Sequence, residues 1–237
     1  VERAKAEAMG KKVQGVVDHY LFVGNPGTGK TTVARIMGNI FYSLGVLPSN
    51  RLLEVTRKDL VEGYVGQTAT KTARVVKRAV GGVFFIDEAY SLMGDNFGQE
   101  ATNTILPMLL DYKGKMVCIA AGYPREIRQW IDTNSGLESR FTKVIHFEDY
   151  NPDELAQIFR MKVKKDKLTL TPEAENAMRV YFTDLYNRRE RNFANAREVN
   201  NYFDRVKKNQ SSRLRHEMER PDFDPASYSI LLPEDMG

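Results

Sequence analysis

A glycine-rich loop is the strongest chemical signal in the sequence. Residues 24–31 read GNPGTGKT and match the pattern GxxxxGK[ST]. In such a loop the backbone curls until successive N–H groups point inward, where they can hold the phosphates of a nucleotide. We predict that Lys30 reaches the β- and γ-phosphates and that the Thr31 hydroxyl binds Mg²⁺. The residues predicted to bind the nucleotide are Asn25, Pro26, Gly27, Thr28, Gly29, Lys30, Thr31 and Thr32.

The flanking sequence fits this chemistry. Residues 20–23 form a short apolar run typical of a buried strand, and residues 31–44 return to helical spacing. A helix beginning at the loop adds partial positive charge where the phosphates would lie. The alternative is a glycine-rich turn that precedes a helix by chance. The residues expected to share one face of that helix are Val33, Ile36, Met37, Ile40, Phe41 and Leu44.

Two adjacent carboxylates form the second candidate site. Asp87 and Glu88 directly follow the apolar run at residues 83–86. Buried charges are costly in a sheet interior, so the pair is expected at an edge that faces a cation. The carboxyl ends of parallel strands border the ligand crevice in such sheets. We predict that Asp87 binds Mg²⁺ through water and that Glu88 is the general base, with exposed loop acids as the alternative.

The two sites belong to an alternation of strands and helices. This alternation predicts an α/β fold with a parallel sheet covered on both faces, and we assign residues 1–150 to it. Residues 1–12 also have a helical composition. The predicted strands are 20–23, 52–55, 83–86, 117–121 and 144–147, and the predicted helices between them are 31–44, 68–80, 99–110 and 124–131.

The pattern changes after residue 150. Asn151 and Thr171 are capping residues, each followed by a proline and acidic residues, which are helix-start signals. The expected helices are 152–166, 172–187 and 195–219, with no strand between them. We therefore predict an all-helical domain at residues 151–220, followed by a tail at residues 221–237 whose apolar patch is at residues 230–232.

Composition restricts the class of protein. Hydrophobic residues make up 42% of the 237 residues, which is ordinary for a globular chain, and the net charge is only +4. Residues 151–220 are more basic, with 16 Lys and Arg against 11 Asp and Glu. The single cysteine, Cys118, lies in an apolar run and is expected in the core, which suits a reducing, cytoplasmic setting. No run approaches the roughly 18 residues of a membrane helix, and the start at Val1 without Met suggests a fragment or a processed chain.

Four strings carry a family resemblance. GNPGTGKTT at 24–32, FIDEAY at 85–90, AGY at 121–123 and FANAR at 193–197 resemble the AAA+ ATPases. Within them, the strings are similar to the subgroup of the red-type Rubisco activases and stage V sporulation protein K. The resemblance implies a P-loop NTPase sheet of order 5-1-4-3-2 with a helical lid, and hydrolysis of ATP with Mg²⁺. It also implies a ring, usually hexameric, with ATP at the subunit boundaries.

The resemblance also assigns roles to single residues. Arg140 matches the arginine finger that reaches a neighbour's γ-phosphate; the alternative is a surface arginine paired with Glu138 or Asp149. Arg197 matches the sensor-2 arginine, with Arg205 as a competitor on the same helix or a solvated arginine as the alternative. Tyr123 occupies the sensor-1 position, where most relatives have Asn.

A third set of residues suggests what the ATPase acts on. Tyr64, Val65 and Gly66 resemble the pore loop with which ring-shaped remodelers grip polypeptide, although a buried or turn-capping tyrosine is the alternative. We therefore expect an ATPase that remodels an unknown protein client through a ring pore. An ATP-driven nucleic-acid motor or loader, favoured only by the basic lid, and a nucleotide-dependent scaffold are the other hypotheses. Lys30, Asp87, Glu88 and Arg140 argue against the scaffold, and no membrane partner is expected.

Overall fold

The computed structural model describes residues 18–64, 66–219 and 224–237, and it divides into two compact units. Of the described residues, unit 1 holds 18–24 and those within 29–147. Unit 2 holds residues 25–28 and residues from 148 onward. The helix expected at residues 1–12 lies outside the described residues.

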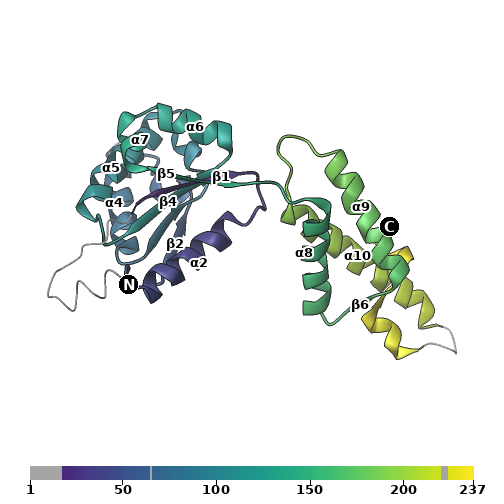
Figure 1. Ribbon diagram of the computed structural model, residues 1–237. Helices are drawn as coiled ribbons and strands as arrows, with labels where there is room; N and C mark the ends of the chain where they lie inside the picture. The colour runs from purple at the N-terminus through teal and green to yellow at the C-terminus, as the bar shows by residue number, and fades with distance from the viewer. Residues whose placement is uncertain (1–17, 65, 220–223) are drawn as a thin grey trace. The chain divides into compact units, whose positions relative to one another are not determined.

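A five-stranded parallel sheet forms the centre of unit 1 (Figure 1). Its order is β2-β3-β4-β1-β5, and every pairing is parallel, which confirms the predicted order 5-1-4-3-2. Because the strands are parallel, the loops that follow β1 and β3 leave the same edge of the sheet. The strands are β1 (Tyr20–Gly24), β2 (Leu52–Val55), β3 (Val83–Ile86), β4 (Val117–Gly122) and β5 (Lys143–Phe147).

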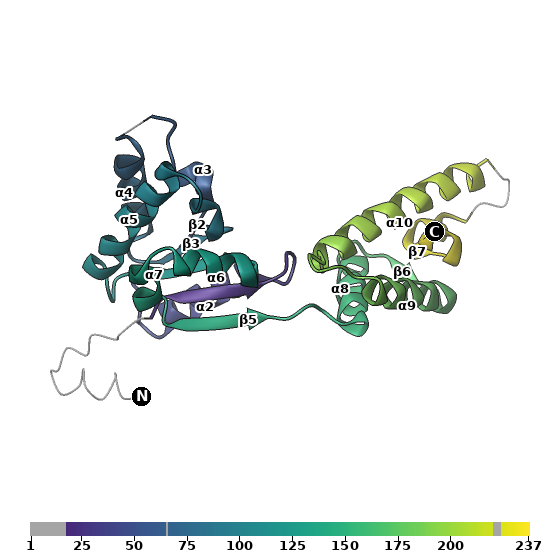
Figure 2. The ribbon, with the colours of Figure 1, turned by 90° about the horizontal axis from the view of Figure 1, so that it is seen from above.

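Helices cover both faces of this sheet. In Figure 1, α2 lies on one side of the strands and α6 and α7 lie on the other, and α4 and α5 lie side by side in Figures 1 and 2. The helical elements are α2 (Lys30–Ser43), α3 (Arg57–Leu60), α4 (Thr68–Ala79), η1 (Ala89–Leu92), α5 (Asn96–Asp111), α6 (Pro124–Asp132) and α7 (Ser135–Arg140).

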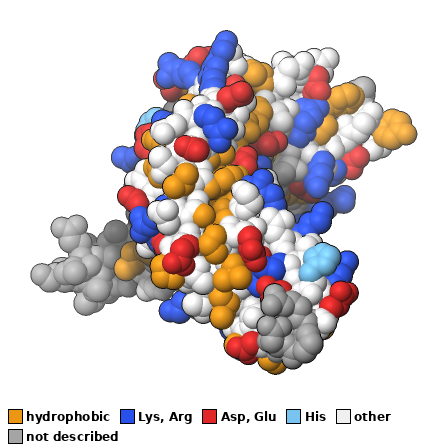
Figure 3. All heavy atoms as spheres, turned by 90° about the vertical axis from the view of Figure 1, so that its right-hand side faces the viewer, with side chains coloured by type: hydrophobic (Ala, Val, Ile, Leu, Met, Phe, Trp, Pro, Cys, Tyr) orange, Lys and Arg blue, Asp and Glu red, His pale blue; other side chains and the backbone are white. Residues whose placement is uncertain are grey.

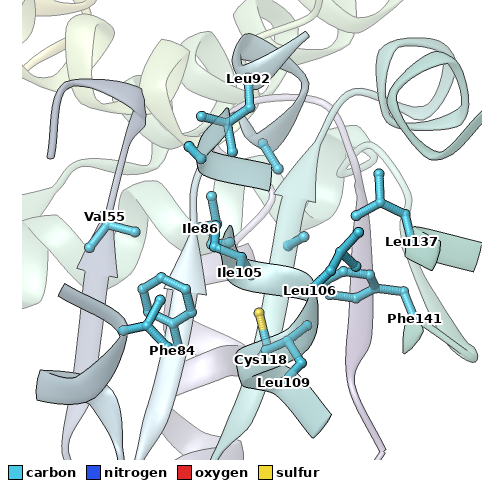
Figure 4. Packing of buried hydrophobic residues seen from close by; sticks show 14 of the residues in the cluster. Val55, Phe84, Ile86, Leu92, Ile105, Leu106, Leu109, Cys118, Leu137 and Phe141 are labelled. Atoms are coloured by element: carbon cyan, nitrogen blue, oxygen red, sulfur yellow. The ribbon is translucent and has the colours of Figure 1, made fainter. Parts of the chain in front are cut away.

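The alternation of side chains along β3 explains the two layers. Phe84 and Ile86 pack in the cluster under α4, α5, α6 and α7, whereas Val83 and Phe85 pack with α2. All four side chains are completely buried, as expected for a strand covered on both faces. Figure 4 shows the first cluster, with Cys118 beside Leu109. Cys118 is fully buried, which confirms its predicted place in the core.

The packing face of α2 differs from the one expected. Three of the residues predicted to share one face, Ile36, Ile40 and Leu44, are 51%, 49% and 66% exposed, so this part of the face does not pack on the core. The helix turns its small residues Ala34 and Gly38 to the sheet instead. A Cβ on Gly38 would lie 3.1 Å from Val83, so this closeness depends on the missing side chain.

Unit 2 is built on three helices, and α10 runs across α8 and α9 (Figure 2). Asn151 caps α8: its Oδ1 accepts from the Glu154 N–H at 3.0 Å, and Glu154 Oε2 accepts from the Asn151 N–H at 2.8 Å. Aromatic side chains fill the core, with Phe159 5.4 Å from Tyr202 between ring centroids. The helices are α8 (Pro152–Lys165), α9 (Pro172–Asn187) and α10 (Ala196–Glu217).

The C-terminal residues are part of this helical unit. β7 (Ile230–Leu231) pairs in parallel with β6 (Thr169–Leu170), a short strand that the sequence did not predict. Leu231 and Met236 are buried in the unit 2 core. Two short helices, η2 (Pro225–Ser229) and η3 (Pro233–Met236), flank β7. The tail after residue 223 thus completes the lid core.

Candidate nucleotide-binding site

The glycine-rich loop joins β1 to α2 at the carboxyl edge of the sheet. Gly24 ends β1 where a Cβ would lie 2.4 Å from the Phe147 carbonyl oxygen, so a larger residue would push β1 from β5. Gly29 precedes α2 with a φ of 90°, a left-handed conformation that glycine adopts without strain. Lys30 Nζ donates to the Gly24 carbonyl oxygen at 2.9 Å, so the lysine side chain reaches back along the loop.

The Thr31 hydroxyl meets a carboxylate that sequence reasoning missed. Thr31 Oγ1 lies 3.5 Å from Glu54 Oε1, and Glu54 belongs to the edge strand β2. A hydroxyl and a carboxylate are oxygen ligands of the type that Mg²⁺ takes, so the residues fit a Mg²⁺ ion. The signal was a charged residue inside the otherwise apolar string LLEV.

The acidic pair follows the buried strand β3 directly. The Asp87 N–H donates to the Val55 carbonyl oxygen at 2.8 Å, which extends the ladder between β2 and β3 by one bond. Asp87 Oδ1 accepts from the Glu88 N–H at 3.0 Å. Glu88 is exposed and has φ 50° and ψ 45°, a left-handed conformation that costs a residue with a side chain about 1 kcal/mol or more. Such local strain clusters at functional sites.

The strings FIDEAY and AGY meet beside this pair. The rings of Tyr90 and Tyr123 are 5.6 Å apart between centroids. A Cβ on Gly122 would lie 2.7 Å from the Tyr90 ring, so only glycine leaves room for that ring. Burial, and then the negative charge of Glu88, raise the pKa of Tyr90 to about 12. Tyr123 immediately precedes α6, where its side chain makes no capping hydrogen bond, and its sensor-1 role stays a prediction.

Within unit 2, the middle of the glycine-rich loop packs against the start of α10. The Gly27 carbonyl oxygen accepts from the Ala196 N–H at 3.2 Å. A Cβ on Gly27 would lie 2.2 Å from the Ala194 carbonyl oxygen and 3.0 Å from the Arg197 nitrogen. Arg197, the second residue of α10, is exposed and lies on the turn that touches the loop.

Arg205, the competing arginine on α10, lies over aromatic rings. The Arg205 guanidinium lies 5.2 Å from the Tyr181 ring centroid and 5.0 Å from that of Tyr202. The two rings stack with centroids 3.7 Å apart, which gives the cation a broad aromatic surface. These contacts favour Arg197 over Arg205 for the predicted sensor-2 role.

Comparison with known proteins identifies the family. The ATPase family associated with various cellular activities (AAA) matches residues 20–149, and the AAA lid domain matches residues 151–237. The chain belongs to the AAA ATPase family.

Several proteins of known name are similar to this chain over most of its length. The chain is 40% identical to Protein CbbX of Cereibacter sphaeroides over all of this chain and 76% of that protein. It is 43% identical to the chloroplastic ribulose bisphosphate carboxylase/oxygenase activase of Cyanidioschyzon merolae, over 83% of this chain and 68% of the activase. It is 39% identical to stage V sporulation protein K of Bacillus subtilis, over 90% of this chain and 67% of that protein.

Solved structures agree on the fold. A crystal structure of the FIGL-1 AAA domain superposes with a TM-score of 0.66, and the crystal structure of that domain in complex with ADP superposes with a TM-score of 0.64, at 16% identity in both cases. The first superposition covers 99% of this chain and 74% of the FIGL-1 chain. None of the described helices of this AAA protein is long and apolar enough to cross a membrane.

Arg140 lies at the other edge of the AAA sheet from the glycine-rich loop. It ends α7, just before β5 begins, and lines one pocket with Asp18 and His19, which precede β1. The glycine-rich loop follows the opposite end of β1, about 15 Å away at ~3.3 Å per strand residue. The Arg140 guanidinium donates to Ser139 Oγ at 2.5 Å, and its Nε is buried without a hydrogen-bond partner.

The predicted pore loop follows α3. Tyr64 is 72% exposed, so the alternative of a buried tyrosine does not hold. Gly66 has a φ of 82°, and the Gln67 N–H donates to the Tyr64 carbonyl oxygen at 3.3 Å, which closes a turn. Val65 lies outside the described residues.

Proposed function

We propose that this AAA protein hydrolyses ATP with Mg²⁺ and uses the free energy to remodel a protein client. The observation that supports this most is the left-handed, exposed Glu88, which follows Asp87 at the sheet edge where the glycine-rich loop begins. An exposed carboxylate held by a strained backbone suits a group that must activate water.

The roles of the loop residues follow from their chemistry. Lys30 neutralises charge on the β- and γ-phosphates, and the backbone N–H groups of residues 25–32 hold the phosphate oxygens. Thr31 and Asp87 would hold Mg²⁺, Asp87 through water, with Glu54 close enough to Thr31 to accept from a metal-bound water. When bound, Mg²⁺ draws electron density from the phosphates. Glu88 takes the proton of the attacking water.

A ring with shared active sites is part of the proposal. Arg140 lies at the amino edge of the sheet, so its own loop is out of reach of its side chain. The guanidinium can therefore serve as an arginine finger only toward a neighbouring copy, where it would stabilise charge on the transferred phosphoryl group. We infer a hexamer from the family, with Arg197 as the sensor-2 contact within the same chain.

A protein is favoured over a nucleic acid as the client. Tyr64 projects an aromatic ring from a loop that ends in a glycine, and a flat ring can grip a polypeptide regardless of its sequence. The face of the molecule in Figure 3 mixes basic and acidic side chains, with apolar ones between them. Nucleic-acid binding would favour a contiguous basic surface.

The hydrolytic part is tested with Glu88→Gln. The variant keeps the size of the side chain but removes the base, so ATP should bind while turnover falls at least 100-fold, as is typical for loss of a general base. The matched control is Glu173→Gln, an exposed glutamate on α9, which should hydrolyse ATP at the wild-type rate. Hydrolysis by Glu88→Gln at the wild-type rate would show that another group is the base.

The client class is tested on the wild-type protein. The ATPase rate is measured alone, with an unfolded protein such as reduced casein, and with single- or double-stranded DNA. Remodelling predicts stimulation by the unfolded protein. Stimulation by DNA alone would favour the nucleic-acid motor instead.

A further inference from the structure

Asn195 has an unusual backbone conformation at the start of α10. It immediately precedes α10, is completely buried, and has φ 51° and ψ −120°. That backbone conformation is one that glycine adopts readily and that other residues adopt only where their surroundings enforce it. The side chain must therefore gain contacts that glycine would lack.

The Asn195 amide uses both its donor and its acceptor. Nδ2 shares its two hydrogens among three acceptors, namely Asp149 Oδ1 at 2.8 Å and the carbonyl oxygens of Phe193 at 3.0 Å and Pro26 at 3.3 Å. Oδ1 accepts from the Tyr150 N–H at 2.8 Å. One side chain thus joins the glycine-rich loop, the entrance to unit 2 and the start of α10.

Three consecutive carbonyl groups of the loop are held in this way. The carbonyl oxygens of residues 26–28 accept, in order, from Asn195 Nδ2 at 3.3 Å, the Ala196 N–H at 3.2 Å and the Tyr150 hydroxyl at 3.1 Å. We call these three donors the carbonyl clamp. In a trans peptide the N–H points away from the C=O. Holding these carbonyls toward their donors therefore turns the N–H groups of residues 27–29 away from those donors.

Those N–H groups are the ones that must face the phosphates. A phosphate cradle works only if successive N–H groups converge on the anion, and each peptide plane can otherwise rotate. Asp149 steadies the clamp, because its carboxylate accepts from Asn25 Nδ2 at 2.9 and 3.2 Å as well as from Asn195. The clamp therefore pre-orders the cradle from the lid side.

We propose that Asn195 is a positioning residue that holds the glycine-rich loop in its phosphate-binding conformation through the carbonyl clamp. The inference rests on the proposed nucleotide-binding role of that loop. It adds a route by which the lid influences the phosphates through the loop backbone, separate from any contact of Arg197. An asparagine suits the position because it donates to one carbonyl while it accepts from another N–H.

The first test replaces Asn195 with glycine. Asn195→Gly accepts the same backbone conformation without strain but loses the side-chain bonds of the clamp. The matched control is Lys167→Gly, because Lys167 has a similar φ of 57° in unit 2 but is exposed and distant in sequence from the loop. Dissociation constants for ADP with Mg²⁺ are measured by calorimetry on the full chain. ADP is chosen because it binds the cradle without being hydrolysed.

We expect Asn195→Gly to weaken ADP binding about tenfold, which is what loss of about one net hydrogen bond in the cradle would cause. Lys167→Gly should bind ADP like the wild type. Circular dichroism at the same temperature confirms that each variant is folded. A purely structural role of Asn195 would lower the melting temperature while leaving the ADP affinity of the folded protein unchanged.

A second pair of variants separates the loop bond from the rest of the network. Asn195→Asp removes the donor and sets two carboxylates side by side at residues 149 and 195. Adding Asp149→Asn restores a donor and an acceptor to that pair but leaves the carbonyls of Pro26 and Phe193 without their bonds to residue 195. The double variant should recover most of the stability lost in Asn195→Asp, while its ADP affinity stays about tenfold below the wild type.

Tyr150→Phe provides a test that does not depend on the folding of an Asn195 variant. It removes only the hydroxyl that donates to Thr28 and should weaken ADP binding about threefold to tenfold. Wild-type affinity in Tyr150→Phe together with every folded Asn195 variant would overturn the proposal. If the wild-type chain itself fails to bind ADP, the nucleotide-binding role is refuted instead.

Discussion

The buried ion pair that joins the C-terminal tail to α10 allows a quantitative test of the fold. Arg213 Nε and Nη2 donate to Asp235 Oδ1 and Oδ2 at 2.9 and 3.0 Å. The two side chains are only 9% and 1% exposed. Asp235 also accepts from the Leu232 N–H at 2.8 Å, which fixes the turn of η3. We use Asp235→Asn as the perturbation, because asparagine has the same shape and keeps one acceptor oxygen.

The expected cost follows from this burial. Breaking a buried pair by removing one partner typically costs about 3–5 kcal/mol, because a charge is left uncompensated. Arg213 keeps a second partner, since its Nη1 lies 3.0 Å from Glu217 Oε1, so we expect the low end, about 3 kcal/mol. With a urea slope of about 1.5 kcal/mol/M, this loss lowers the midpoint of lid unfolding by about 2 M.

The matched control is the neighbouring residue. Glu234 approaches the same Arg213 Nε at 3.5 Å but is 63% exposed, and exposed pairs contribute about 0–1 kcal/mol. Glu234→Gln should therefore change the midpoint little. Circular dichroism follows the unfolding of the helices. The fluorescence of Trp130, the single tryptophan, follows unit 1 separately, because Trp130 lies in that unit. A loss in Asp235→Asn no larger than that in Glu234→Gln would refute the reasoning.

Two further predictions concern unit 1. Burial lowers the pKa of His19, whose Nδ1 accepts from the Cys118 N–H at 3.0 Å. A hydrogen bond to the Leu109 backbone and the charge of Asp18 raise that pKa in part, whereas the charges of Lys113 and Arg140 lower it further. The unfolded chain therefore takes up a proton first as the pH falls through about 6.5, so unit 1 should lose stability below that pH. His19→Asn, which keeps an acceptor but does not titrate, should remove this part of the pH dependence of the Trp130 urea midpoint; an unchanged dependence would assign it to other groups. For the proposed ring, Arg140→Ala alone and Lys30→Ala alone should each lose more than about 100-fold in ATPase rate, and mixing the two should restore some activity at hybrid interfaces. No recovery at any mixing ratio would contradict a finger acting on a neighbour.

The sheet was the part of the fold that the sequence predicted best. Short apolar strings such as the four residues of β3 favour strands buried on both faces, because they are too short for a buried helix and are followed by polar residues. The face of α2 was harder, because the rule that large apolar side chains point inward fails where Ala34 and Gly38 let the helix approach the sheet. The tail was harder still, since the place of Leu231 and Met236 depends on distant partners.

In the candidate site, too, the residues of local motifs were predicted and those that depend on distant contacts were not. Local motifs gave the glycine-rich loop and the acidic pair, because their residues are consecutive in sequence. Glu54 was missed, since only the pairing of β2 beside β3 brings it to Thr31. Asn195 stood inside the quoted string FANAR, but its role depends on Pro26, which is 169 residues away. Spacing along the chain carries no information about such a contact.

The division of the glycine-rich loop between the two units gives the proposed clamp a mechanical consequence. Residues 25–28 pack with unit 2, whereas Gly24 and the residues from Gly29 onward belong to unit 1. Any change in the conformation of this segment must be taken up at its two junctions, Gly24 and Gly29. Gly29 has a φ of 90°, which glycine adopts without strain, whereas Gly24 is held in β1, where a Cβ would lie 2.4 Å from the Phe147 carbonyl oxygen. The segment that the proposed clamp holds would therefore turn at Gly29 rather than at Gly24.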